Sequence, residues 1–127
     1  MARIIMADDD ELVSFLVRSL LEDAGHIVGV LPDGDTVVDV VRFKRPDLLI
    51  LDCGMPGKAG LTVLRELRAS VVGARMPVLV LTARRSEADR TLAFEAGASD
   101  YMMKPFDGDE LVVRVESLLE TPARRRA

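Results

Sequence analysis

Asp52 is the carboxylate whose surroundings in this sequence point most directly to chemistry. It follows Asp47–Leu51, a run that can form a buried strand, and precedes Cys-Gly-Met-Pro-Gly, where a strand must end. Continuous apolar strands are typical of parallel sheets, in which ligands bind at the carboxyl ends of the strands. A lone aspartate at this point could equally end a strand or cap a turn. A functional interpretation of Asp52 therefore depends on what the other strands carry at their ends.

Three consecutive aspartates, Asp8-Asp9-Asp10, follow the first apolar run, Arg3–Ala7. Beyond them, apolar residues recur at helical spacing, and Gly25 can serve as a left-handed cap. The acidic cluster therefore lies between the end of a strand and the start of a helix. One aspartate is enough to cap that helix and to suit the positive end of its dipole. Three adjacent carboxylates repel one another, so the excess suggests a cation.

Strand and helix patterns alternate five times along the chain. The predicted strands are residues 3–7, 26–31, 47–51, 78–81 and 100–103, each followed by a helical pattern. Capping-box patterns open the last two helices, at Ser86 with Asp89 and at Asp107 with Glu110. This alternation predicts an α/β domain with right-handed crossovers around a central parallel sheet.

Composition limits the function classes. The 127 residues suit one domain, and 49% hydrophobic with 30% charged residues is typical of a soluble globular protein. No apolar run is long enough to span a membrane, so we expect a cytoplasmic protein without a membrane partner. The net charge of −4 argues against nucleic-acid binding by this domain. One cysteine, Cys53, and one histidine, His26, cannot form a conventional zinc site.

Four of the five predicted strands end in polar groups that suit one reaction: Asp8 and Asp9, Asp52, Thr82, and Lys104. The second strand ends in Pro-Asp-Gly and lacks such a group. If the first and third strands are neighbours, the three carboxylates share one crevice. Two like charges ~4 Å apart repel by roughly 4 kcal/mol at an effective dielectric of 20, so a cation is needed. Oxygen ligands alone favour Mg²⁺.

The remaining polar groups suit phosphoryl transfer. Lys104 supplies a mobile positive charge, and Thr82 a hydroxyl that can donate to a phosphoryl oxygen. Both match a transition state whose charge spreads over three equatorial oxygens. Asp52 would then be the nucleophile and form an aspartyl phosphate.

These motifs resemble the receiver domain of two-component response regulators. The resemblance is carried by Ile-Ile-Met-Ala-Asp-Asp-Asp, Leu-Asp-Cys-Gly-Met-Pro-Gly-Lys-Ala-Gly, Leu-Thr-Ala and Ala-Gly-Ala-Ser-Asp-Tyr-Met-Met-Lys-Pro-Phe. It covers residues 1–120 and leaves 121–127 as a tail or the start of a linker. It implies a flavodoxin-like (βα)5 doubly wound parallel sheet with strand order 2-1-3-4-5.

The resemblance also implies a phosphoacceptor. Asp52 would take a phosphoryl group from the phosphohistidine of a sensor histidine kinase or a histidine phosphotransfer protein. Mg²⁺, or Mn²⁺ in its place, would be bound by Asp9 and Asp52 directly, by Asp8 through water, and by the backbone carbonyl of Gly54. The domain would promote its own phosphorylation and dephosphorylation without being an enzyme in the usual sense.

Further roles follow from the same resemblance. Lys104 would contact the phosphoryl group, and the Lys104–Pro105 peptide bond would be cis. Thr82 and Tyr101 would form the switch that alters the face made by the fourth helix, the fifth strand and the fifth helix. Tyr101 could alternatively be an ordinary core aromatic, but its place three residues before Lys104 matches the switch position.

Receivers of the winged-helix transcription-factor subfamily use that face to dimerise through three ion pairs across the interface. Two of the pairs are retained here, Arg90 with Glu110 and Asp100 with Arg114, and the third is missing at both ends. The sequence thus predicts a phosphorylation-dependent homodimer. The alternative is that these four are ordinary solvated charges.

Two other interpretations compete with a phosphoacceptor. Phosphatases of the haloacid-dehalogenase type also place an aspartate nucleophile at a strand end with Mg²⁺ and a lysine. They need a second aspartate two residues later as the general acid, and that position is Gly54. A degenerate receiver that binds partners without phosphorylation is the other alternative, and the presence of all the main site residues argues against it.

Overall fold

The computed structural model describes residues 1–120, so the tail predicted at 121–127 lies outside the described residues. The elements in chain order are β1 Arg3–Ala7, α1 Glu11–Asp23, β2 Ile27–Leu31, α2 Val37–Lys44, β3 Leu48–Leu51, α3 Gly60–Ala69, β4 Val78–Thr82, α4 Glu87–Ala96, β5 Asp100–Met103 and α5 Gly108–Leu119. The predicted alternation is confirmed, with boundaries displaced by one or two residues in most elements.

The five strands form one parallel sheet in the order β2-β1-β3-β4-β5. The predicted fold class and strand order are therefore confirmed. Ala7, the last residue of β1, pairs with Leu51, the last residue of β3. Because the two strands end level with each other, the next residues of each chain segment, Asp8 and Asp52, leave the sheet side by side.

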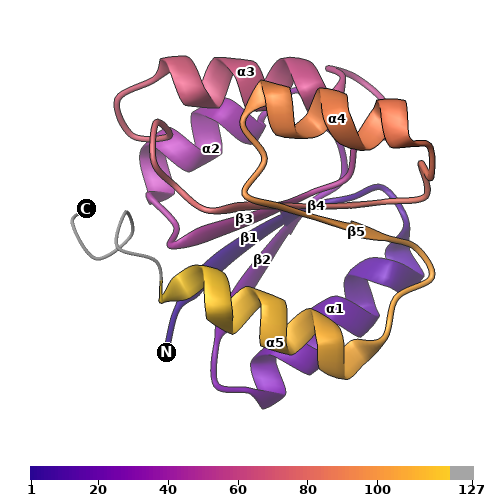
Figure 1. Cartoon of the computed structure of the whole chain (residues 1–127). Helices are drawn as coiled ribbons and strands as arrows, with labels where there is room; N and C mark the ends of the chain where they lie inside the picture. The colour runs from indigo at the N-terminus through magenta and orange to yellow at the C-terminus, as the bar shows by residue number, and fades with distance from the viewer. Residues whose placement is uncertain (121–127) are drawn as a thin grey trace.

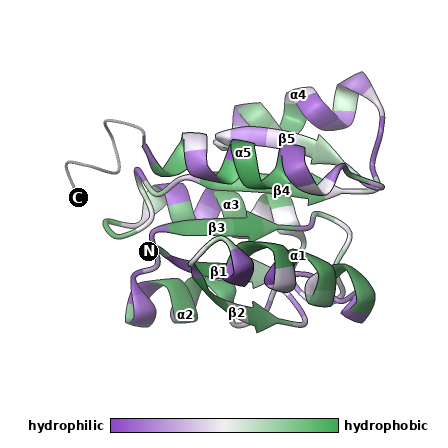
Figure 2. Ribbon diagram, turned by 90° about the horizontal axis from the view of Figure 1, so that it is seen from below, coloured by the Kyte–Doolittle hydropathy of each residue, from purple (hydrophilic) through white to green (hydrophobic). Residues whose placement is uncertain are grey.

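Helices cover both faces of the sheet. In Figure 1, α2, α3 and α4 lie on one face and α1 and α5 on the other. Each face has its own hydrophobic cluster, one including Val41, Leu64 and Ala93 and the other including Leu21 and Leu111. Every residue of β3 and β4 is buried, as expected for strands covered on both sides. Figure 2 shows these two central strands as continuous hydrophobic ribbons.

Side-chain caps begin three of the helices. Asp10 accepts hydrogen bonds from the amides of Leu12 and Val13 at the start of α1, and Ser86 accepts one from Asp89 at the start of α4. The capping box predicted at Asp107 and Glu110 is only half correct. Asp107 caps α5, but Glu110 pairs with Arg114 instead of returning to the backbone of Asp107.

Arg68, on α3, joins three segments at the amino-terminal edge of the sheet. Its Nε and Nη2 donate to the carbonyl oxygen of Gly97, at 2.9 and 2.8 Å. Its Nη1 donates to the carbonyl oxygens of Gly73, at 2.8 Å, and Met76, at 2.6 Å. Burial lowers the pKa of this guanidinium, and its hydrogen-bond partners are carbonyl oxygens and the hydroxyl of Ser99 rather than a carboxylate. Gly97 ends α4, so the positive charge also meets the negative end of that helix.

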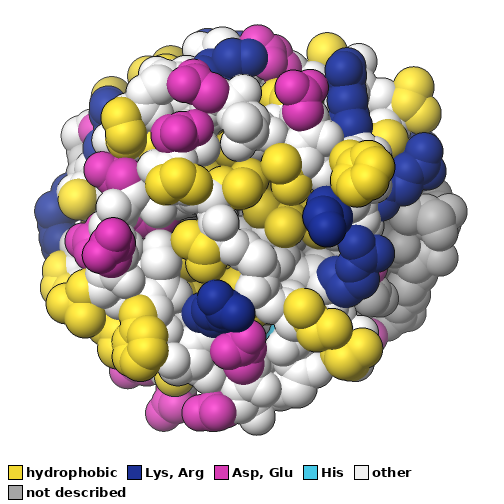
Figure 3. Space-filling view, turned by 180° about the vertical axis from the view of Figure 1, so that it is seen from behind, with side chains coloured by type: hydrophobic (Ala, Val, Ile, Leu, Met, Phe, Trp, Pro, Cys, Tyr) yellow, Lys and Arg dark blue, Asp and Glu magenta, His cyan; other side chains and the backbone are white. Residues whose placement is uncertain are grey.

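The surface carries both signs of charge. The face in Figure 3 shows Lys and Arg side chains gathered on the right of the view, while acidic side chains predominate on the left. Exposed Arg42 and Lys44 lie near the end of α2, and exposed Asp9 and Asp10 follow β1 at the other edge of the sheet. Within residues 1–120, no helix has the length and apolar character that crossing a membrane would require.

We predict that Arg68→Met lowers the free energy of unfolding by about 2 kcal/mol, because carbonyl groups at three places lose a charged donor. In a domain of this size, Tm should fall by roughly 6–10 °C. Arg65→Met, an exposed change on the same helix, is the control and should leave Tm nearly unchanged. Thermal unfolding followed by circular dichroism measures both, and equal Tm values for the two variants would contradict the prediction.

Candidate functional site

Backbone hydrogen bonds at the carboxyl edge of the sheet hold three of the predicted site residues in place. The amide of Asp8 donates to the carbonyl of Leu31, and that of Asp52 to the carbonyl of Ala7, each at 3.0 Å. The amide of Lys104 donates to the carbonyl of Thr82 at 2.8 Å. Each functional residue thus extends the sheet ladder by one step before its chain segment turns away.

The three predicted carboxylates meet at this edge. Asp8, Asp9 and Asp52 each offer a ligand oxygen, and these oxygens lie within 4.8 Å of one another. Asp8 and Asp52 are buried, whereas Asp9 is exposed. The third aspartate of the cluster, Asp10, caps α1. The sequence argument that one aspartate caps the helix and the others remain for a cation therefore agrees with this geometry.

Each buried carboxylate has one oxygen bonded to a backbone amide and one facing Lys104. Oδ1 of Asp8 accepts from the amide of Asp10, and Oδ1 of Asp52 from the amide of Gly54, both at 2.9 Å. The Nζ of Lys104 lies 2.7 Å from Oδ2 of Asp8 and 3.4 Å from Oδ2 of Asp52. One lysine is thus the common counter-ion of two carboxylates.

The charge balance at this edge remains negative. Burial raises the pKa of Asp8 and the charge of Asp52 adds to this effect, while Lys104 and the amide of Asp10 oppose it. Burial lowers the pKa of Lys104, but Asp8 and Asp52 outweigh burial and raise it. Lys104 therefore keeps its proton at neutral pH.

The donor set fits a hard divalent cation. Within residues 1–120, Oδ2 of Asp8 is buried and accepts no hydrogen bond of good geometry, in spite of its ion pair with Lys104. Such an oxygen, beside two further carboxylates and a single lysine, matches the all-oxygen ligand sets that Mg²⁺ prefers.

Thr82 and Tyr101 lie on the adjacent strands β4 and β5. Thr82 is 1% exposed, and its Oγ1 accepts from the amide of Arg84 at 3.3 Å, which leaves the hydroxyl proton available to a phosphoryl oxygen. Tyr101 is 5% exposed and its hydroxyl donates to the carbonyl oxygen of Arg84 at 2.8 Å. Tyr101 is therefore a core residue whose polar end is tied to the segment that follows Thr82.

A small cavity of about 120 Å³ separates this tyrosine from the loop after Asp52. Cys53, Leu61, Arg84 and Tyr101 are among the residues that line it. Burial raises the pKa of the Cys53 thiol to about 11, and the charge of Asp52 adds to this effect. The thiol is therefore neutral at physiological pH and inert as a nucleophile.

One feature of the site lay beyond the sequence analysis. The Nη1 of Arg85 donates to the carbonyl oxygen of Lys104 at 2.9 Å, which links the segment after β4 to the segment after β5. No spacing rule distinguishes Arg85 from the neighbouring Arg84. The Lys104–Pro105 peptide bond is cis, which is the conformation that the resemblance implied.

The four residues of the proposed dimer face are already engaged within the chain. Nη1 of Arg114 lies 2.9 Å from Oδ1 of Asp100, and Nη2 of Arg114 lies 2.7 Å from Oε1 of Glu110. The guanidinium of Arg90 lies 5.4 Å from the centre of the Phe94 ring. The pair predicted across subunits, Asp100 with Arg114, thus forms inside one subunit.

The fold and this site place the chain in a known class. Residues 4–116 match the family model described as the response regulator receiver domain, and the chain belongs to that family. It is a receiver domain of a two-component response regulator. It is 43% identical over 117 residues to the response regulator MprA of Mycobacterium tuberculosis strain H37Rv, an alignment that covers 92% of this chain and 50% of MprA. The chain spans about half the length of the curated relatives it matches.

Solved structures similar to this chain are also receiver domains. The BeF3-activated receiver domain of Klebsiella pneumoniae RstA is 34% identical, with a TM-score of 0.88, and the match covers 94% of this chain and 99% of that one. The receiver domain of a sensor histidine kinase from Pseudomonas aeruginosa PAO1 is 29% identical, also with a TM-score of 0.88, and the match covers 94% and 98%. That structure has a magnesium ion coordinated in its active site cleft.

We predict that Cys53 reacts slowly with iodoacetamide in the folded protein. A thiol pKa of about 11 instead of 9.0 lowers the thiolate fraction at pH 8 roughly 100-fold, and burial restricts access further. Alkylation followed by mass spectrometry should be at least that much slower in buffer than in 8 M urea. Rates in the two solutions that agree within tenfold would contradict the assigned burial of Cys53.

Proposed function

We propose that this domain is a phosphoacceptor, in which Asp52 takes a phosphoryl group from a phosphohistidine in a reaction that depends on Mg²⁺. The observation that carries the proposal is the meeting of three carboxylates with one shared lysine at the carboxyl edge of the sheet. The partner would be a sensor histidine kinase or a histidine phosphotransfer protein. The proposal requires no general acid, because the imidazole of the donor is a far better leaving group than an alcohol.

Asp8, Asp9, Asp52 and the carbonyl of Gly54 would hold Mg²⁺, with Mn²⁺ as the alternative ion. When bound, the ion supplies charge neutralisation for the carboxylates and for the phosphoryl oxygens. Magnesium bound to a related receiver supports this assignment. The backbone supplies further support, because an amide fixes one oxygen of Asp8 and one of Asp52, and the other oxygen of each faces the shared Lys104 rather than a backbone group.

Asp52, Lys104 and Thr82 would each have a separate role in the transfer. A carboxylate oxygen of Asp52 forms a bond to phosphorus while the phosphorus–nitrogen bond to the donor imidazole breaks and the imidazole leaves with the bonding pair. Lys104, which is paired with Asp8 and Asp52, turns toward the incoming phosphoryl oxygens as their charge develops. The hydroxyl of Thr82 donates to another of these oxygens.

Thr82 and Tyr101 would couple phosphorylation of Asp52 to a change at the surface. A hydrogen bond from Thr82 to the phosphoryl group draws the segment after β4 toward Asp52, and the hydroxyl of Tyr101 is bonded to that same segment at Arg84. The face made by α4, β5 and α5 would therefore respond to the state of Asp52. We infer that this face controls the output.

We predict that acetyl phosphate with Mg²⁺ adds a single phosphoryl group, and that Asp52→Asn abolishes the addition. EDTA should stop the labelling of the wild type. Asp39→Asn, an exposed change on α2, is the control and should be labelled like the wild type. Mass spectrometry of the intact protein measures all four samples. Undiminished labelling of Asp52→Asn would refute the acceptor assignment.

The same face is proposed to form a phosphorylation-dependent homodimer. The ion pairs of Arg114 already exist within one subunit, so exchanging them for pairs between subunits contributes little free energy; exposed pairs are worth at most about 1 kcal/mol each. Apolar contacts must then provide most of the affinity. Exposed Leu92, Phe94, Met103 and Val113 lie on the three elements of the face and could supply them.

We predict a monomer without beryllofluoride, a mimic of the phosphoryl group, and a dimer with it, as measured by light scattering at high micromolar concentration. Val113→Glu should prevent the dimer without reducing phosphorylation, because Val113 is 67% exposed on α5. Phe43→Glu is the matched control, since Phe43 is 83% exposed on α2, which is not one of the three elements of the face. A wild type that stays monomeric in both states would rule out this dimer.

A further inference from the structure

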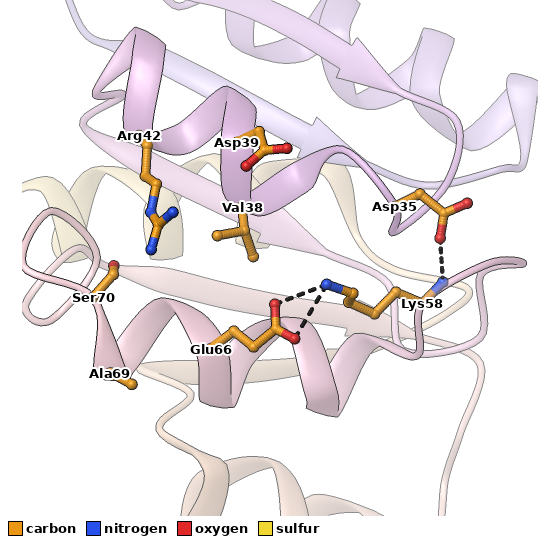
Figure 4. A pocket seen from close by; sticks show the side chains of 8 residues that line it. All are labelled: Asp35, Val38, Asp39, Arg42, Lys58, Glu66, Ala69 and Ser70. Carbon is orange, nitrogen blue, oxygen red and sulfur yellow. Dashed lines mark hydrogen bonds and ion pairs between the residues drawn. The ribbon is translucent and has the colours of Figure 1, made fainter.

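The turn after β2 carries no group that could take part in phosphoryl transfer, but it lies directly against the loop that follows Asp52. The Oδ1 of Asp35 accepts a hydrogen bond from the amide of Lys58 at 2.9 Å. The amide of Gly34 donates to the carbonyl oxygen of Pro56 at 3.3 Å. Figure 4 shows the carboxylate of Asp35 directed at the backbone nitrogen of Lys58, beside a cavity of about 330 Å³ between α2 and α3.

The two loops fit together without space for extra atoms. A Cβ at Gly34 would collide with the carbonyl oxygen of Lys58. A Cβ at Gly57 would lie 2.7 Å from Oδ1 of Asp35, and Gly57 also has a φ of +77°, which disfavours other residues. The contact therefore joins the backbones of the two loops, and the carboxylate of Asp35 is its only charged acceptor among the described residues and also packs against Gly57.

Lys58 is also held from the opposite side. Its Nζ lies 2.8 and 3.1 Å from the two carboxylate oxygens of Glu66 on α3, as drawn in Figure 4. At the other end of the loop, the amide of Gly54 donates to Oδ1 of Asp52. The segment from Gly54 to Lys58 is thus anchored at both ends, and Asp35 is the side chain that anchors it from the turn after β2.

This anchoring concerns the one proposed metal ligand that is not a carboxylate. Asp8, Asp9 and Asp52 follow strands of the sheet, whereas the carbonyl of Gly54 belongs to the anchored loop. Mg²⁺ demands near-ideal octahedral geometry, so its affinity is sensitive to small displacements of a ligand. The hydrogen bond of Asp35 is exposed to solvent, and its loss should change global stability little.

We infer that Asp35 is a positioning residue for the metal site. Its carboxylate fixes the amide of Lys58 and thereby sets the loop that presents the carbonyl of Gly54. The inference rests on the proposed function, because it assumes that this carbonyl is a ligand of Mg²⁺. It gives the turn after β2 a role in the site, although that turn contributes no group to the reaction.

The test compares Asp35→Ala, Asp35→Asn and Asp39→Ala by the Mg²⁺ dissociation constant from isothermal titration calorimetry. Asp35→Ala should weaken Mg²⁺ binding about 10-fold, the lower end of the effect of outer-shell partners. Asp35→Asn keeps an acceptor oxygen and should stay within about twofold of the wild type. Asp39→Ala removes an equal charge from the rim of the same cavity and should have no effect.

Two further measurements separate positioning from a general loss of structure. The urea midpoint in EDTA should be the same for all variants, and the amide of Lys58 should exchange hydrogen faster only in Asp35→Ala. Unchanged Mg²⁺ affinity in Asp35→Ala would overturn the inference, as would an equal loss in Asp39→Ala, which would indicate a long-range charge effect. A wild type that binds no Mg²⁺ and is not labelled by acetyl phosphate would overturn the proposed function itself.

Discussion

Repulsion among three carboxylates within 4.8 Å of one another is the constraint on which the rest of this structure depends. The two buried carboxylates, Asp8 and Asp52, oppose folding by an amount of the order of 4 kcal/mol at an effective dielectric of 20, whereas solvent screens the exposed Asp9. The sheet can hold the carboxylates together because β1 and β3 pair up to their last residues, Ala7 and Leu51, and β3 is buried along its whole length. Lys104 offsets part of the repulsion, and the remainder makes the site receptive to a divalent cation.

Much of the fold and the site could be predicted because both depend on local signals. Apolar periodicity located the five strands and five helices, and polar residues after β1, β3, β4 and β5 indicated the site. The roles of Arg68 and Asp35 could not be predicted in this way. Their partners are backbone groups of segments distant in sequence, and such contacts depend on how closely loops approach in three dimensions. The capping box also predicted that the side chain of Glu110 accepts a hydrogen bond from the amide of Asp107. Glu110 instead pairs with Arg114, a charged partner one turn later.

The helix nearest the proposed switch is also the one with the smallest buried side chains. The buried residues of α4 are Ala93 and Ala96, whereas α3 buries Val63, Leu64 and Leu67. An alanine contributes far less burial free energy than a leucine or valine, so displacing α4 costs less than displacing its neighbours. Arg68 holds the carbonyl end of α4 at Gly97. Movement of this helix is therefore easiest at the end that begins at Ser86, close to the site.

The protonated thiol of Cys53 has a consequence for the fate of a phosphorylated Asp52. An aspartyl phosphate is a mixed anhydride, and its carbonyl carbon is open to attack by any thiolate within reach. Attack by the next residue would release phosphate and leave a thioester, which would end the signal without hydrolysis. Burial raises the thiol pKa to about 11 and thereby withholds the reactive form of the sulfur. The proposed aspartyl phosphate would then be discharged by water or by return to a histidine rather than by its neighbouring thiol.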